Sequence, residues 1–573
     1  MKNRLSEIYL KLKLKLSKAA MPHRMKFILI GILSTIWFLI RVIPKPSRAA
    51  YPCMRVAAPF MSALVIYLIS LGGIAAAFHK TRQYLKEARY LAAAGSLAVM
   101  VFIIAFSLSS DSRDSAAATA WETGPDDGPN QPMGTEVGVH PGRVVWSWDP
   151  DATDENAQGY FFNPLYVNEE VIGKMFSKSV KELAGESTIE EAWEAIFRNF
   201  NYRKHGFQRG YEPGEKIFIK INQTSGRGKI RPKERKKGNY DVLSDVPLDG
   251  PPIRTCETTP YMVQELLRHL VNHCGIEQSD IAVGDPQNPT LGHNYDAWAS
   301  EFPDIIYTDR MFGTFGRTLI EPTSEDLLFY SDKIYSDKLF DVIKEADYMI
   351  NMANLKPHGR AGITLTAKNH FGSQSRQSAN HLHYSLVCPV VSGSPSNGGY
   401  KKYRVQVDLM GSKYLGRNTL LFIVDDLFAG GSTEGGPPVK YFMSPFHGDW
   451  CNSIFISQDQ VALESVCFDF LRTEWDGTHK HSPTNNHYES LASVKGVDDY
   501  LHQAALSSNW PEGIIYDPDN SGKPLASLGV HEHWNNPDMK QYSRNLGKPD
   551  GIELVSIPSR LMGDRAARIA SRK

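Results

Sequence analysis

The sequence predicts an α/β domain with a mostly parallel sheet and flanking helices, preceded by two or three transmembrane helices. Long apolar stretches occupy the N-terminal part of the chain as far as Leu108. From Arg143 onward, short apolar segments alternate with segments of helical periodicity. Strands that alternate with helices form βαβ units, whose strands run parallel to one another.

Two of the apolar stretches are long enough to span a bilayer. Residues 58–78 contain no charge, and residues 91–108 are similar but slightly shorter. Residues 27–43 are apolar up to Ile40 and then contain Arg41, so they span only if Arg41 extends its charge to the interface. We therefore expect the membrane to be a partner, with two or three spans.

The number of spans decides on which side of the membrane the large domain lies. Residues 1–26 form a basic tail in which Glu7 is the only acid, and such a tail stays in the cytoplasm. Three spans then place the large domain outside the cytoplasm, and two spans place it inside. After Leu108 acidic residues replace basic ones, among them Asp111 and Asp114. This favours three spans in the cytoplasmic (inner) membrane, with the large domain extracytoplasmic.

The rest of the chain divides into a linker and one large domain. Residues 109–141 are rich in Ser, Ala, Gly, Pro and Asp, which is typical of a linker. Residues 142–573 are expected to form the α/β domain, with a C-terminal extension of it from about residue 476. Strands are predicted at 144–146, 216–221, 281–283, 348–351, 420–424 and 454–456. Helices are predicted at 168–183, 189–200, 259–274, 338–345 and 460–472, with Thr259 and Asp459 as N-caps.

Charge and cysteine content argue against some partners and cofactors. The chain has 63 basic and 63 acidic side chains, so no net field attracts nucleic acid. Its six cysteines show no C-x2-C spacing, and we expect neither an iron–sulfur cluster nor a disulfide scaffold. Histidines recur two residues apart at His381 and His383 and at His531 and His533. Imidazole and carboxylate groups suit zinc, nickel or iron, so a metal cofactor remains open.

Polar residues follow the predicted strands in a consistent way. The densest stretch is residues 354–372, where basic side chains alternate with glycines. Ligands of parallel sheets bind beyond the carboxyl ends of the strands. The residues that we expect to gather at this edge are Lys220, Asn222, Asp285, Lys356, His358, Lys368 and Asn369. Basic groups beside glycine-rich backbone suit an anionic group, and a desolvated lysine can act as a base.

Two hypotheses about function follow from this predicted site. The first is an enzyme that acts on a small anionic molecule, in which Lys356 and Lys368 hold the anionic group and His358 transfers a proton. The second is a non-catalytic, membrane-tethered module that binds a ligand or assembles a complex through the same pocket. An enzyme needs a titrating group beside the ligand, whereas a binding module needs only fixed donors. The sequence gives no indication of the substrate or the oligomeric state.

An ordered set of short segments runs through the predicted domain. These segments are Ile219–Asn222, Thr259–Pro260, Val283–Asp285, Ala346–Asn351, Leu355–His358, Thr364–Gly372, Val424–Asp425 and Asp459–Ala462. Together they resemble the domain-of-unknown-function family 362 (DUF362), over roughly residues 143–472. The resemblance implies a domain whose reaction is unknown. Some members are fused to ferredoxin-like iron–sulfur modules, and this chain lacks the cysteine cluster of those modules.

A more distant resemblance rests on the spacing within one of these segments. His358, Ala361-Gly362 and Lys368 follow one another, with ten residues from His358 to Lys368. This order is similar to a motif of the nickel-pincer lactate racemases. The resemblance implies that Lys368 attaches the cofactor and that His358 is a catalytic base or acid. Thr366-Ala367 stands where that family has Gly-Gly.

Overall fold

The computed structural model describes residues 79–80, 83, 87, 128–224, 230–243, 248, 256–387, 397–431, 437–478 and 495–558. The chain divides into two compact units, Met1–Ala120 and Trp121–Lys573, and nearly all described residues belong to the second. The basic tail and the spans expected at 27–43, 58–78 and 91–108 lie outside the described residues. Within the described ranges, no helix combines the length and the apolar character needed to cross a membrane.

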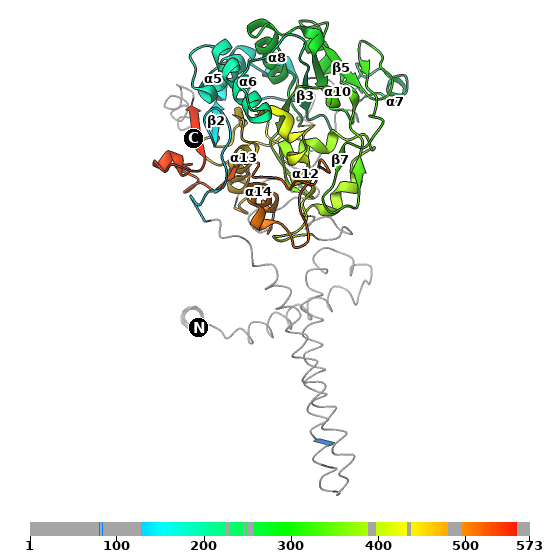
Figure 1. The fold of residues 1–573 in the computed structure, drawn as a ribbon. Coiled ribbons are helices and arrows are strands. Elements are labelled where there is room, and N and C mark those ends of the chain that lie inside the picture. Colours follow the sequence, from blue (N-terminus) through cyan, green and yellow to red (C-terminus); the bar gives the residue numbers. More distant parts are fainter. Residues whose placement is uncertain are drawn as a thin grey trace, which may run out of the picture. The chain divides into compact units, whose positions relative to one another are not determined.

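A nine-stranded sheet forms the centre of the second unit (Figure 1). The strand order is β15-β2-β13-β12-β9-β3-β4-β5-β6. The bounds are β2 Arg143–Trp148, β3 Ile217–Ile221, β4 Ile281–Gly284, β5 Ile306–Asp309, β6 Thr318–Leu319, β9 Tyr348–Asn354, β12 Thr419–Asp426, β13 Ser453–Ser457 and β15 Glu553–Pro558. In this sheet β13 pairs antiparallel with both of its neighbours, and every other pair is parallel. The mostly parallel sheet predicted from the sequence is therefore confirmed.

Helices cover both faces of the sheet and give the unit three layers (Figure 1). The first face carries α5 (Glu169–Ala184), α6 (Ile189–His205) and α8 (Pro260–Arg268). The second face carries α12 (Val405–Gly411), α13 (Gln460–Glu474) and α14 (Asp499–Ala505). Successive strand residues point to opposite faces, so Ile219 packs in the core of the first face and Phe218 in a core of the second.

Several elements differ from what the sequence predicts. The sequence indicates β13 as a strand but not its antiparallel direction, because an apolar run looks the same in both directions. β15 comes from the predicted C-terminal extension and pairs with β2. β1 (Met133–Gly134) lies inside the predicted linker and pairs with β14 (Val530–His531), so the folded unit begins before residue 142. Helix α10 (Asp341–Lys344) is shorter than the helix predicted at 338–345.

The start of helix α8 is fixed by a distant carboxylate and not by the side chain of the predicted N-cap, Thr259. Thr259 does precede α8, but its side chain makes no capping hydrogen bond. Its backbone N–H instead donates to Oδ2 of Asp425, at 2.6 Å, from the end of β12. Burial raises the pKa of Asp425 to about 6. A strand-end carboxylate therefore fixes the start of this helix, a contact that local sequence cannot indicate.

Asp459 connects three parts of the fold that are far apart in the sequence. Its carboxylate accepts the backbone N–H of Ala462 at 2.9 Å and so caps α13, as predicted. It also accepts the N–H groups of Val137 at 3.1 Å and Val530 at 3.2 Å. These contacts hold the segment after β1 and the start of β14 against the helix. Burial raises the pKa of Asp459 to about 7.

Replacing Asp459 by Ala should lower the free energy of unfolding by about 2 kcal/mol or more, because three backbone N–H groups lose their acceptor. A pKa raised in the folded state means that this carboxyl group binds its proton more tightly in the folded protein. Its contribution to stability therefore decreases as the pH rises from about 4 to about 7. Denaturant unfolding of the purified protein at pH 5 and pH 8 should show a larger loss at pH 5.

The matched control for this substitution is Asn168→Ala. Asn168 caps α5 through one exposed contact, from Val171 N at 3.3 Å, and its loss should cost about 1 kcal/mol. Equal losses in the two variants would contradict the view that the contacts of Asp459 with Val137 and Val530 stabilise the fold.

Candidate functional site

A pocket of about 270 Å³ opens at the carboxyl ends of the parallel strands. It is termed the carboxyl-edge pocket. The chemically active side chains on its wall are Asn222, Asp285, Lys356, Lys368, Asn369 and His383. Five of these six were predicted from the sequence. Of the other two predicted site residues, Lys220 lies beneath the wall, and His358 is not among the described residues that line the pocket.

The register of the sheet places Lys220 beneath this pocket. Because Ile219 points to the first face, Lys220 points to the second. Lys220 lies beside Asn351 of the neighbouring strand β9. Asn351 Nδ2 donates to the carbonyl of Thr366 at 3.0 Å, at the start of the short helix α11 (Thr366–Asn369). The two strands and α11 therefore meet at Lys220.

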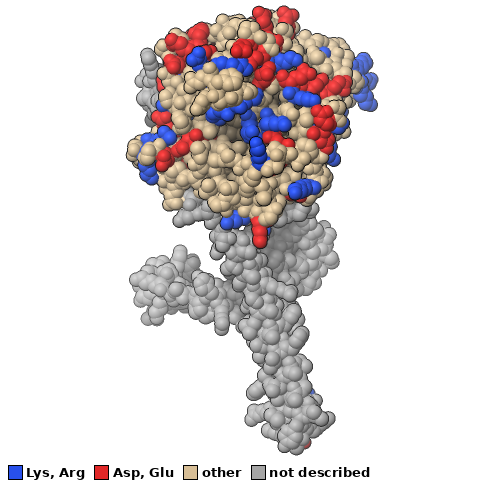
Figure 2. All heavy atoms as spheres, in the orientation of Figure 1, with Lys and Arg blue, Asp and Glu red and all other residues tan. Residues whose placement is uncertain are grey.

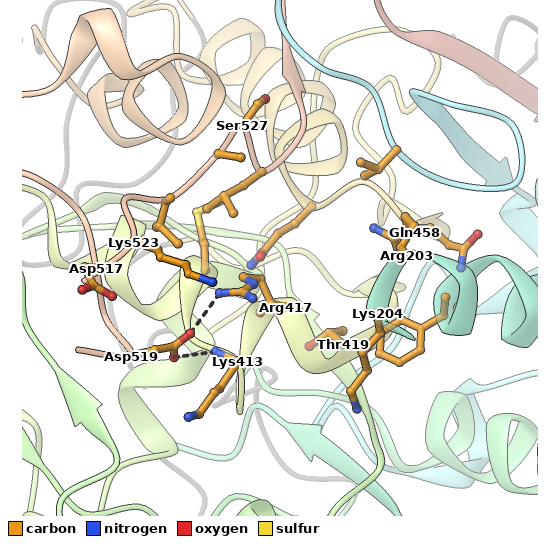
Figure 3. Close-up of a pocket in the computed structure, with 18 of the residues that line it drawn as sticks. Arg203, Lys204, Lys413, Arg417, Thr419, Gln458, Asp517, Asp519, Lys523 and Ser527 are labelled. Carbon is orange, nitrogen blue, oxygen red and sulfur yellow. Dashed lines mark hydrogen bonds and ion pairs between the residues drawn. The ribbon is translucent and has the colours of Figure 1, made fainter. Parts of the chain in front are cut away.

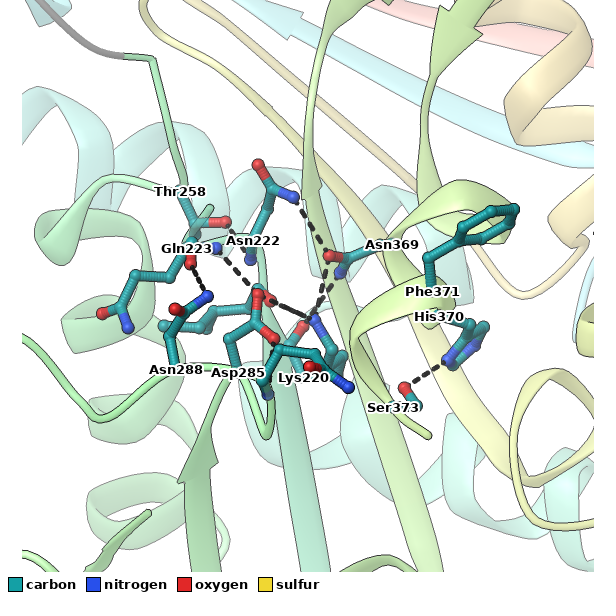
Figure 4. A network of polar contacts seen from close by, with 12 residues as sticks. Lys220, Asn222, Gln223, Thr258, Asp285, Asn288, Asn369, His370, Phe371 and Ser373 are labelled. Atoms are coloured by element: carbon teal, nitrogen blue, oxygen red, sulfur yellow. Dashed lines mark hydrogen bonds and ion pairs between the residues drawn. The ribbon is translucent and has the colours of Figure 1, made fainter. Parts of the chain in front are cut away.

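Lys220 and Asp285 form a fully buried ion pair (Figure 4). Nζ of Lys220 lies 3.4 Å from Oδ2 of Asp285. The same ammonium donates to the carbonyl of Ile221 at 2.6 Å and to Oδ1 of Asn369 at 3.1 Å. Burial lowers the pKa of Lys220 and raises the pKa of Asp285. Burial thus disfavours the charged forms of both groups, and their mutual attraction opposes this effect.

Asp285 also determines how closely the surrounding loops approach. Its Oδ2 accepts the N–H of Gln223 at 3.1 Å, and its Oδ1 accepts the N–H of Gln287 at 3.3 Å. A Cβ atom added at Gly372 would lie 2.5 Å from Oδ1 of Asp285 and 3.0 Å from Nζ of Lys220. Only glycine lets the chain after α11 pass so near the ion pair.

Lys356 is a buried cation that is held by neutral groups. It lies in a hairpin formed by β10 (Lys356–His358) and β11 (Gly362–Thr364), and it is 1% exposed. Its Nζ donates to Oδ1 of Asn222 at 3.0 Å and to the carbonyl of Cys256 at 2.7 Å. In the described part of the chain, no carboxylate lies within ion-pair distance of Lys356. Its charge is therefore left without a balancing anion among these residues.

Lys368 and Asn369 reach the pocket from α11. The Lys368 ammonium lies 3.9 Å from the centroid of the Phe371 ring, which is a cation–π contact. Nδ2 of Asn369 donates to Oδ1 of Asn351 at 2.9 Å, and its Oδ1 accepts from Nδ2 of Asn222 at 3.3 Å. The Asn369 amide is thus fixed in one orientation between two strands (Figure 4).

A glutamate from another helix holds α11 in place. Oε1 of Glu464, on α13, accepts the N–H of Ala367 at 2.5 Å and also the hydroxyl of Thr366. The hydroxyl of Tyr500, on α14, donates to Oε2 of the same carboxylate. Burial raises the pKa of Glu464. The position of Lys368 therefore depends on two helices of the second face.

The histidine on the pocket wall is His383 rather than His358. Nδ1 of His358 accepts the N–H groups of Arg360 at 3.0 Å and Ala361 at 3.1 Å, within the turn between β10 and β11. The His358 ring centroid lies 6.4 Å from that of His383. Nδ1 of His383 donates to the carbonyl of Ala379 at 3.0 Å, so Nε2 is the nitrogen through which this ring would exchange a proton. The role predicted for His358 in proton transfer stays a prediction.

A larger pocket of about 690 Å³ lies at the opposite edge of the sheet, where β12 begins. It is termed the basic pocket. The basic side chains that line it are Arg203, Lys204, Lys413, Arg417 and Lys523 (Figure 3). Figure 2 shows Lys and Arg gathered around a hollow in this view of the unit. All five are exposed, and Arg417 already pairs with Asp519 at 2.9 Å. Hydrated or paired cations attract an anion less strongly than a buried one does.

A comparison with protein families matches part of the carboxyl-edge pocket to a known family. The model of the family described as "Domain of unknown function (DUF362)" matches residues 248–469. Residues 248–469 form a DUF362 domain. This confirms the resemblance found in the short segments of the sequence. The DUF362 domain contains Asp285, Lys356, Lys368 and His383, whereas Lys220 and Asn222 precede the matched range. No curated protein matches the chain, so the resemblance to lactate racemases stays a prediction.

Some pocket residues of the DUF362 domain were missed in the sequence. Gln287 and Asn288 line the pocket directly after Asp285, and the signal for them is their polar character at the same strand end. His383 was noted only as part of a histidine pair. It reaches the pocket because η8 (Asn380–Ser385) folds back beside Phe371, with 5.4 Å between the two ring centroids. That approach is long-range, and no local pattern indicates it.

The cysteines described for the DUF362 domain and its surroundings are separate thiols. Cys256, Cys274, Cys451 and Cys467 form no disulfide among the described residues. Burial raises the pKa of Cys274 to about 12, which keeps this thiol protonated. The expected absence of an iron–sulfur cluster stays a prediction, since Cys53 and Cys388 lie outside the described residues.

Replacing Asp285 by Asn should destabilise the fold by about 3–5 kcal/mol, because it leaves the buried Lys220 charge without its partner. The double variant Lys220→Met/Asp285→Asn should lose less, since it removes both charges together. Denaturant unfolding of the two variants and of the parent protein measures the difference.

A suitable control for the buried pair is an exposed pair of the same type. Lys216 and Glu345 lie 2.6 Å apart with more than half of each side chain exposed. Lys216→Met should change the free energy of unfolding by less than about 1 kcal/mol. An Asp285→Asn loss as small as this would mean that Lys220 and Asp285 are not a charged pair in the folded protein.

Proposed function

We propose that the carboxyl-edge pocket of the DUF362 domain binds a small anionic molecule and that the protein is an enzyme acting on it. The observation that carries this proposal is Lys356. A buried ammonium with no carboxylate partner is costly, because the surrounding dipoles replace its hydration only in part. A bound anion would supply the missing opposite charge. The pocket therefore gains more from an anionic ligand than from a neutral one.

Further residues of the pocket suit the same kind of ligand. Lys368 brings a second ammonium to the wall, and the amides of Asn222 and Asn369 supply hydrogen-bond groups in fixed orientations. The volume of about 270 Å³ is slightly below that of typical ligand sites, which is about 300–1,000 Å³. This size favours a small metabolite over a large cofactor. We infer a carboxylate or phosphate of low molecular mass.

Two groups near the pocket are suited to proton transfer. His383 lies on the wall with its Nδ1 bonded to the carbonyl of Ala379, so it would exchange a proton through Nε2. The Lys220–Asp285 pair lies beneath the wall. Burial lowers the pKa of Lys220 and raises the pKa of Asp285. A general base must reach the proton that it removes and must have a pKa near the working pH. These groups favour an enzyme over the alternative of a non-catalytic binding or assembly module, which would need only the fixed donors.

Inorganic phosphate and malonate should raise the melting temperature of the protein, and Lys356→Met should abolish this effect. An anion present at ten times its dissociation constant stabilises the folded state by about 1.4 kcal/mol. Thermal unfolding with and without each anion measures the shift. Lys368→Met should weaken the shift without abolishing it, because Lys356, which has no carboxylate within ion-pair distance among the described residues, remains.

The basic pocket provides the control for this experiment. Lys413→Met and Lys523→Met remove charges of the same kind from exposed positions and should leave the shift unchanged. A shift that persists in Lys356→Met but is lost in Lys413→Met or Lys523→Met would assign anion binding to the basic pocket instead. No stabilisation of the parent protein by either anion would also contradict the proposal.

We also propose that residues 27–43, 58–78 and 91–108 anchor the protein in the cytoplasmic membrane, with the DUF362 domain outside the cytoplasm. The support comes from the sequence alone: two uncharged stretches of sufficient length, a basic tail before them and an acidic segment after them. With three spans, residues 44–57 lie outside the cytoplasm and residues 79–90 inside it. With two spans, both assignments are reversed.

A reporter that is active only in the cytoplasm should be inactive when fused after Lys573 and active when fused after Lys86. The two fusions respond in opposite directions to the number of spans, so each controls for the expression of the other. Strong activity after Lys573 together with none after Lys86 would show that residues 27–43 do not span and that the large domain lies inside.

A further inference from the structure

A cluster of two histidines and one carboxylate lies between α13, α14 and β14, and none of its members lines the carboxyl-edge pocket or the basic pocket. Asp498, His531 and His533 each offer a ligand atom, and these atoms lie within 4.8 Å of one another. All three side chains are buried. We propose that these three residues bind a divalent transition metal, with Zn²⁺ as the best fit. The site is separate from the proposed anion site and does not depend on it.

The backbone of β14 directs both histidines to one side. His531 and His533 are two residues apart in an extended segment that pairs with Met133 of β1 and, through a single bridge, with Pro129. Alternate residues of extended chain share a face. Glu532 points the other way, where it accepts from the Ser543 hydroxyl at 2.7 Å. The two imidazoles are therefore placed to act together as a bidentate ligand on the side that faces α13 and α14.

Each histidine is oriented by a partner on α13. Nδ1 of His533 lies 2.8 Å from Oδ1 of Asp469, and Nδ1 of His531 lies 2.8 Å from the hydroxyl of Ser465. These contacts engage Nδ1 of each ring, so each histidine would bind a metal through Nε2. A histidine that donates its second N–H to a carboxylate is the usual arrangement around protein-bound zinc. Asp469 also pairs with Arg472 at 2.7 Å, so its charge is already balanced.

Asp498 is the carboxylate that completes the cluster. It occupies the N-cap position of α14, yet its side chain makes no capping hydrogen bond. Its Oδ2 instead lies 3.6 Å from Nε2 of His533. Two ligand atoms of a tetrahedral zinc site are roughly 3.4 Å apart, given bonds of about 2.0–2.1 Å. The observed separation thus matches the distance across a metal ion better than it matches a direct hydrogen bond.

The charge of Asp498 supports the same conclusion. Among the described residues, only His533 comes within ion-pair distance of its carboxylate. A divalent cation between Asp498 and His533 would balance the buried negative charge of the carboxylate. Two imidazoles and one carboxylate form a ligand set that zinc accepts.

His502 lies beside the cluster and suits the fourth position. It follows Asp498 by one helical turn on α14, and its ring centroid lies 4.6 Å from that of His531. Four ligands from the protein would close the coordination sphere, as in structural zinc sites. Such a site would join α14 and β14, which lie beyond the matched DUF362 range, to each other near the end of α13.

The full-length protein, prepared without a histidine tag, should retain about one Zn²⁺ per chain after loading with the metal and dialysis. His531→Ala and His533→Ala should each weaken Zn²⁺ binding by at least about 100-fold, and Ser465→Ala should weaken it by about 10-fold. Elemental analysis gives the stoichiometry, and competition with a chelator gives the affinity. Removing the metal should lower the melting temperature of the parent protein but not that of His533→Ala.

The matched control is His381→Ala. His381 is also a largely buried histidine bonded to a carboxylate, that of Asp337 at 2.6 Å, but it lies outside the cluster. This variant should keep its zinc and its response to the chelator. Because the alanine variants can fail to fold, Asp498→Asn provides a milder test, and circular dichroism verifies folding. Stoichiometric zinc in both histidine variants, or no retention of Zn²⁺, Fe²⁺ or Ni²⁺ by the parent protein, would overturn the proposal.

Discussion

The ion pair between Lys220 and Asp285 joins the ends of two neighbouring parallel strands, and the carboxyl-edge pocket is built around it. Asp285 accepts backbone N–H groups from the loops that follow both strands. Lys220 donates to Asn369 and so draws α11 down onto the sheet. Because Gly372 has no side chain, the chain beyond α11 passes directly over the pair. The loops of a parallel sheet usually vary independently, whereas here one charged contact makes their positions depend on one another.

Much of the scaffold could be predicted from the sequence, since burial on both faces of a sheet leaves a clear apolar pattern. The strands at β3, β4, β9 and β12 were found in this way, and their polar ends indicated Asn222 and Asp285 as pocket residues. The alternation of strand side chains even explains why Lys220 reaches α11 although its neighbours are apolar. These features depend on residues that are close in the sequence, where elementary periodicity rules apply.

The features that could not be predicted depend on contacts between distant segments, and local sequence patterns do not reveal such contacts. The hairpin of β10 and β11 lies inside a stretch that looks like one polar loop, and its turn engages His358 through Arg360 and Ala361. His383 lines the pocket only because a later turn folds back. Likewise, the pairing of β1 with β14 joins segments nearly 400 residues apart in the chain. In the sequence, the segment of β1 looks like part of a linker, and the segment of β14 looks like part of a C-terminal extension.

The carboxylate of Glu464 has a consequence for how the parts of the molecule communicate. It contacts α11 on one side and Tyr500 of α14 on the other, and Tyr500 follows Asp498 by two residues. The positions of α14 and of the helix that carries Lys368 are therefore linked through one side chain. Energetic coupling in proteins travels through such contiguous packed and hydrogen-bonded elements. The segment beyond residue 469 thus takes part, through Tyr500 and Glu464, in positioning the helix that carries Lys368.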